Sequence, residues 1–63
     1  MTELYFKYKT IPYLFDTEQL KLFRLIDNQR IEIKNPEILH KVRLGSSEIN
    51  RERAFRLAFG FDK

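Results

Sequence analysis

The chain contains no cysteine, so its fold must be stable without a disulfide bond. This matters because the chain has only 63 residues, and ordering each residue costs roughly 1.5 kcal/mol. Six phenylalanines and three tyrosines can each bury a large apolar area. We therefore expect a single domain over residues 1–63, stabilised by an aromatic core or by a partner chain.

The first fifteen residues have the pattern of β-structure. Apolar and polar residues alternate over residues 3–9, from Leu4 to Tyr8, which predicts a half-buried strand. Pro12 cannot donate a ladder hydrogen bond, so residues 11–15 are predicted to form an edge strand or an irregular return.

The next stretch carries the signals of a helix over residues 17–27. Asp16 can cap its first turn, and Gln19 occupies the reciprocal position of a capping box. Five apolar residues form a broad stripe at helical spacing, which is typical of a helix covered from two sides: Leu20, Leu22, Phe23, Leu25 and Ile26.

A strand and a helix are predicted to follow. Apolar and polar residues alternate again over residues 30–34, which predicts a strand with Ile31 and Ile33 facing inward. Asn35 can cap a helix over residues 36–44 whose first residue is Pro36, where a missing N–H costs nothing.

A second helix is expected directly after the first. Gly45 can take the left-handed conformation that ends one helix, and Ser46 or Ser47 can cap the next. Apolar residues at helical spacing predict that helix over roughly residues 48–59, with Gly60 as its end. The predicted fold class is therefore α+β, with the order β(β)αβαα.

The net charge of +3 lies entirely in the second half of the chain. Residues 30–63 carry eight basic and five acidic side chains, whereas residues 1–29 carry four of each. Such an asymmetry indicates an anionic partner for the second half, although a basic solvated surface has the same pattern.

The composition argues against catalysis. His40 is the single histidine and cysteine is absent, so no metal site of the usual His/Cys type and no nucleophile–base set can be proposed. The two glycines are isolated, which leaves no phosphate-binding loop. We predict that the chain is not an enzyme and holds no metal or cofactor.

No apolar run approaches the ~20 residues that span a bilayer. Lys7 and Lys9 also interrupt any apolar segment of a signal peptide near the N-terminus. We therefore expect a cytoplasmic protein that makes no membrane contact.

The order strand, Pro-started helix, Gly-Ser break and helix in residues 30–61 resembles the ribbon-helix-helix family of repressors. The resemblance rests on the segments 31–33, 35–38 and 45–47, followed by residues 51–54. It implies a homodimer in which two copies of the strand form a ribbon in the DNA major groove.

By position, the resemblance assigns base reading to Arg30, Glu32 and Lys34. It also assigns a phosphate contact to the backbone at Ser46 and Ser47, taken as the start of the last helix.

A helix-turn-helix pair is an alternative for the same residues. The second helix would then start with groove-facing polar side chains: Ser46, Ser47, Asn50, Arg51 and Arg53. A third alternative is that the two helices simply pack on a sheet.

The first functional hypothesis is a small, dimeric, repressor-like regulator that binds double-stranded DNA. Its candidate contacts are Arg30, Lys34, Arg43, Ser46, Ser47, Asn50, Arg51, Arg53 and Arg56.

The second hypothesis is a protein-interaction module, such as an inhibitor or adaptor of phage or mobile-element origin that binds a host or cognate protein. It would use an aromatic surface or a free strand edge in residues 3–15. Its candidate contacts are Tyr5, Tyr13, Phe15 and Phe61.

Overall fold

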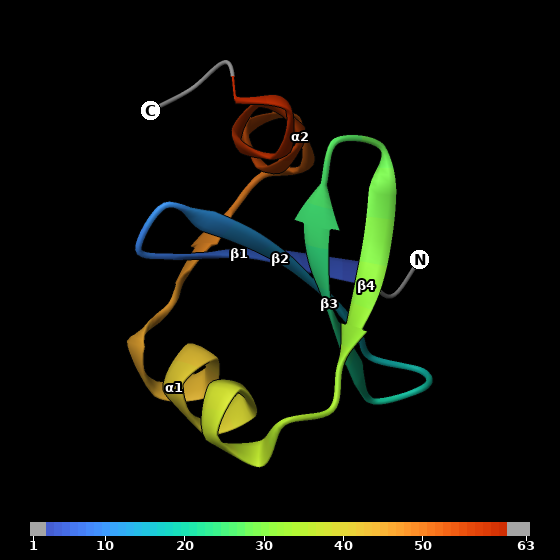
Figure 1. The fold of residues 1–63 in the computed structure, drawn as a ribbon, viewed down its shortest axis with the longest axis vertical. Coiled ribbons are helices and arrows are strands. Elements are labelled where there is room, and N and C mark those ends of the chain that lie inside the picture. Colours follow the sequence, from blue (N-terminus) through green and yellow to red (C-terminus); the bar gives the residue numbers. More distant parts are fainter. Residues whose placement is uncertain (1–2, 61–63) are drawn as a thin grey trace.

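In the computed structural model, which describes residues 3–60, the chain forms a five-stranded antiparallel sheet and two helices (Figure 1). Four strands follow one another as a meander, and the sheet order is β4-β3-β2-β1-β5. The elements are β1 (Glu3–Tyr8), β2 (Ile11–Asp16), β3 (Lys21–Ile26), β4 (Gln29–Ile33), α1 (Pro36–Gly45), β5 (Ser47–Ile49) and α2 (Arg51–Phe59).

The α+β content agrees with the sequence-based prediction, but the predicted order β(β)αβαα is wrong. The observed order is ββββαβα, with four strands before the first helix. Because β5 separates the helices and pairs with β1, α1 and α2 are not the consecutive helix pair that we predicted.

The predicted helix over residues 17–27 is a turn followed by β3. The Asp16 carboxylate accepts hydrogen bonds from the N–H groups of Glu18 and Gln19, as a helix cap would, but the chain then reverses. Leu20 has a left-handed φ of 56°, which ends any helical continuation. Leu22 and Leu25 are buried in different core clusters, on opposite faces of the sheet. Because both faces of β3 are covered, its apolar residues do not alternate simply with polar ones, and the sequence looks like a helical stripe.

Residues 11–15 also differ from the prediction, because β2 lies in the middle of the sheet. It pairs with β1 on one side and with β3 on the other. The ladder to β3 begins at Tyr13, one residue after Pro12, so the missing donor of Pro12 lies just outside that ladder.

Asparagine caps start both helices. The Asn35 side chain accepts a hydrogen bond from the Glu37 N–H at 2.9 Å, which confirms the predicted start of α1. The Asn50 side chain accepts one from the Arg53 N–H at 2.7 Å. Gly60 ends α2 with a left-handed φ of 82°, as predicted.

The connection between the helices was predicted incorrectly. Gly45 is the last residue of α1 and does not have a left-handed conformation. It lies against the Tyr8 ring, so that a Cβ atom added at Gly45 would be only 3.0 Å from Cε1 of Tyr8. Ser46 has an extended backbone and leads directly into β5, which begins at Ser47. Neither serine lies at a helix N-terminus, because α2 starts only after Asn50.

The two helices lie on opposite sides of the β1–β2 hairpin (Figure 1). On the side that we call the α2 face, Tyr5, Leu14 and Leu25 form a buried cluster with Ala54 of α2. On the opposite α1 face, a second buried cluster contains Val42 of α1.

Candidate interaction surfaces

An apolar groove of about 500 Å³ lies between α1 and the sheet. Its lining is mostly apolar, and Arg43 and Ser46 are the polar residues among those that line it. We call it the α1 groove. Its lining residues are Leu4, Phe6, Phe15, Leu22, Leu39, Val42, Arg43 and Ser46.

The strand register builds the floor of the α1 groove. Leu4 of β1 lies opposite Phe15 of β2, and Phe15 lies opposite Leu22 of β3. Residues directly opposite each other in an antiparallel sheet point to the same face, so these three side chains form one apolar row. Leu4 remains 39% exposed, which shows that the row is only partly covered.

Successive turns of α1 form the opposite wall. Val42 and Arg43 lie three and four residues after Leu39, so all three share one side of the helix. Val42 is buried, whereas Leu39 is 36% exposed. The helix thus touches the sheet through part of its apolar side and leaves the rest facing the groove.

Arg43 is the charged residue of the groove lining. Its guanidinium forms no ion pair with any carboxylate of residues 3–60. A guanidinium at the edge of apolar surface can donate two parallel hydrogen bonds to an incoming carboxylate.

The α2 face is filled. Leu14 and Ala54 are both 0% exposed, and the rings of Tyr5 and Phe55 pack with centroids 6.1 Å apart. The α2 helix packs against β1, β2 and β3, whereas the sheet contacts of α1 are sparser.

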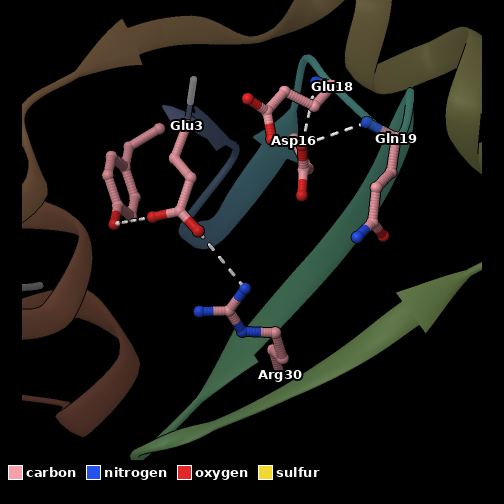
Figure 2. A network of polar contacts seen from close by, with 6 residues as sticks. Glu3, Asp16, Glu18, Gln19 and Arg30 are labelled. Carbon is pink, nitrogen blue, oxygen red and sulfur yellow. Dashed lines mark hydrogen bonds and ion pairs between the residues drawn. The ribbon is translucent and has the colours of Figure 1, made fainter. Parts of the chain in front are cut away.

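A polar network connects Glu3 at the start of β1 with Tyr5 and with Arg30 of β4 (Figure 2). The Glu3 carboxylate accepts a hydrogen bond from the Tyr5 hydroxyl at 3.3 Å and another from the Arg30 guanidinium at 3.4 Å. Burial raises the pKa of the Tyr5 phenol above its ordinary value of 10.0, and the negative charge of Glu3 raises it further. Burial and Glu3 together therefore disfavour ionisation of Tyr5, and Glu3 also connects β1 to Arg30 of β4.

Several residues predicted to contact nucleic acid already have partners in the chain. Arg30 pairs with Glu3, and Arg56 pairs with Glu52 at 2.9 Å. The Arg51 guanidinium lies 5.5 Å from the centre of the Phe55 ring. The side-chain oxygen of Asn50 is used as the α2 cap.

The other predicted nucleic-acid residues are divided between the two sides of the molecule. Arg43 and Ser46 line the α1 groove, and Lys34 is exposed between β4 and α1. Ser47 begins β5, and Arg53 lies in the first turn of α2. The predicted residues therefore lie on elements on both sides of the β1–β2 hairpin, and their contact with nucleic acid stays a prediction.

The residues predicted for a protein interface also separate. Tyr5 and Tyr13 are buried and cannot act as exposed anchors. Phe15 lines the α1 groove, and Phe61 lies outside the described residues.

The structure adds five apolar residues to the candidate interface that the sequence did not single out: Leu4, Phe6, Leu22, Leu39 and Val42. The alternation in β1 already placed Leu4 and Phe6 on one side of a strand, which is a usable signal. The apolar side of α1 is another, but nothing in the sequence indicates that the two surfaces enclose a groove.

No protein-family model, curated protein or solved structure matched the chain. Neither of the helices in residues 3–60 has the length and apolar composition needed to cross a membrane. Within the same residues, histidine and acidic side chains form no group of three placed to hold a metal ion.

Proposed function

We propose that the protein is a protein-interaction module whose α1 groove binds an apolar segment of a partner protein. The observation that carries the proposal is the groove itself, which leaves Leu4 and Leu39 more than one third exposed beside buried apolar neighbours. Concave apolar surfaces with a few polar groups are the usual form of binding sites, and contiguous exposed apolar surface is typical of protein contacts.

The charge at the groove defines the partner further. Arg43 has no carboxylate partner within residues 3–60, and the chain carries a net charge of +3. A segment with two or three large apolar side chains and an adjacent aspartate or glutamate would fill the groove and pair with the guanidinium. We therefore propose an apolar partner segment that is acidic at one end.

Binding to double-stranded DNA, the first hypothesis from the sequence, stays a prediction. A nucleic-acid surface is usually a patch or stripe of clustered lysine and arginine. Here the candidate residues lie on elements on both sides of the β1–β2 hairpin, and the Arg51 guanidinium lies over the Phe55 ring. The α1 groove therefore supports the interaction module better.

Selection of random peptides displayed on phage, with the whole chain immobilised, tests this function. We expect enrichment of peptides that combine large apolar residues with an acidic residue, and chemical-shift changes at the α1 groove when a selected peptide is added. Arg43→Glu should change the selected charge from acidic to basic, because like charges across an interface are repelled.

Two matched pairs on α1 separate binding from folding. Leu39→Glu should weaken peptide binding at least about ten-fold, whereas Leu44→Glu, at a 72% exposed position outside the groove, should not. Arg43→Glu is paired with Lys41→Glu in the same way. Selected peptides that bind all four variants equally, or a failure to enrich any peptide, would contradict the proposal.

Titration with a generic DNA duplex at two salt concentrations tests the competing prediction. Salt-dependent duplex binding that is lost in Arg51→Ala and Arg53→Ala, together with a failed peptide selection, would replace the interaction module by the DNA-binding regulator.

A further inference from the structure

The strand β4 is an edge of the sheet with features that allow pairing to another strand. It is hydrogen-bonded to β3 on one side and has no strand partner on the other among residues 3–60. Natural edge strands are usually protected from pairing by shortness, proline, a bulge or charged side chains, especially lysine. The sequence of β4, QRIEI, contains no proline and has one basic and one acidic residue.

The charges of β4 are complementary to those of a second β4. When two copies pair antiparallel with Ile31 opposite Ile31, Arg30 of each copy lies opposite Glu32 of the other. Directly opposite residues point to the same face, so both Arg–Glu pairs form on the same side of the sheet. With a two-fold axis at Ile31, Arg30 and Glu32 of each copy therefore both pair with an opposite charge on the other copy.

The exposed apolar residue of β4 lies at the same centre. Ile31 is 49% exposed although the sequence predicts that it faces inward. It lies on the face of β4 opposite Arg30 and Glu32, so the two Ile31 side chains would meet on the other side of the joined sheet. Apolar contact and ion pairing thus require the same register.

Contacts within one chain leave both charges accessible. Arg30 reaches Glu3 at 3.4 Å, and Lys21 approaches Glu32 at 4.0 Å, both with partly exposed side chains. Long, exposed pairs of this kind are weak. The other sheet edge, β5, has only three residues and offers a much shorter ladder.

We propose that two copies of the chain pair through β4 in antiparallel orientation, with Ile31 on the two-fold axis, and join their sheets into one continuous sheet. The proposal uses a different surface from the α1 groove and does not depend on the proposed function.

Sedimentation of the full chain over a concentration range up to millimolar tests the pairing. The wild type should approach twice the monomer mass of 7.7 kDa. Arg30→Glu places glutamates opposite each other, and Glu32→Arg does the same with arginines. Each single variant should raise the dimer dissociation constant at least about ten-fold.

The decisive sample is an equimolar mixture of the two single variants. In that mixed pair every position 30 meets the opposite charge at position 32, so the dimer mass should return, and the Arg30→Glu/Glu32→Arg double variant should also dimerise. As a control, Glu18→Arg makes the same charge change as Glu32→Arg, but on an exposed turn, and should leave the dimer mass unchanged.

Thermal unfolding and amide spectra of each variant establish that it is folded. A wild type that stays monomeric at every concentration would overturn the proposal. So would a dimer that the single variants leave intact, or a mixture of folded variants that remains monomeric.

Discussion

The α2 face and the α1 face of the same strands differ in how completely a helix covers them. On the α2 face, Leu14 and Ala54 are completely buried, and the helix packs against three strands. On the α1 face, Val42 is buried but Leu39 is 36% exposed, and a groove of about 500 Å³ remains. In a chain this small, a filled face can supply most of the stability while the other stays open for binding.

Truncating a side chain on each face gives the largest expected difference. Leu14→Ala should lower the free energy of unfolding by about 2–5 kcal/mol, because it leaves a cavity in packed surroundings. Leu39→Ala should cost about 1 kcal/mol or less, since its side chain already borders open space. Urea denaturation followed by circular dichroism measures both, and equal losses would remove the distinction between the faces.

Enlarging a side chain should have opposite signs on the two faces. Ala54→Leu should destabilise the protein by about 1–3 kcal/mol, because no space remains under α2. Ser46→Leu should stabilise it by up to about 1 kcal/mol by filling part of the α1 groove. The same Ser46 variant should bind selected peptides more weakly, and a gain in both stability and peptide affinity would contradict the groove assignment.

Removing either helix cap should cost the same free energy locally, but the effect on the whole protein should differ between the two helices. Asn50→Ala and Asn35→Ala should each cost about 1 kcal/mol. The loss at α2 should lower the global free energy of unfolding, because Ala54 of α2 belongs to the buried cluster with Leu14. The loss at α1 should instead speed exchange of α1 amide hydrogens about five-fold through local opening, with little global change.

The smallest expected effect is the response of the filled face to alkaline pH. Tyr5 has a folded-state pKa above 10.0, so the unfolded chain loses this proton first. The resulting stability is present below pH 10.0 and is lost as the pH rises through the folded pKa. Glu3→Gln should reduce this loss, because it removes a negative charge that raises the pKa, and Tyr5→Phe should abolish the contribution of this group.

Denaturation midpoints at increasing pH, together with tyrosinate absorbance, measure this dependence. A wild type and a Tyr5→Phe variant that lose stability in parallel would show that other groups cause the alkaline response.

Local signals in the sequence predicted several elements correctly. The cap of Asn35 before Pro36 and the left-handed Gly60 fix the start of α1 and the end of α2 by backbone chemistry alone. The alternation from Leu4 to Tyr8 was enough to identify β1.

The prediction failed where tertiary contacts decide the structure. Asp16 provides the same cap to a turn as to a helix, and Leu22, Phe23 and Leu25 face both sides of a covered strand, which imitates a helical stripe. The α1 groove was not predictable, because it depends on the register of three strands and on how α1 lies across them. Likewise, β5 is too short to be recognised before its pairing with β1 is known.

The pairing of β5 with β1 has a consequence for how the chain folds. The strands β1 to β4 are joined by short turns and can form from local contacts, whereas Tyr5 pairs with Ile49 far along the chain. When β1 to β4 have formed, residues 34–46 still have to close as a loop onto β1, and β5 offers only three residues for pairing. We therefore expect this ladder to form after the four-stranded meander. Since α1 lies within that loop, its groove is complete only when the ladder has closed. A partner that binds there would act as a sensor of complete folding, and would slow unfolding by holding the final closure in place.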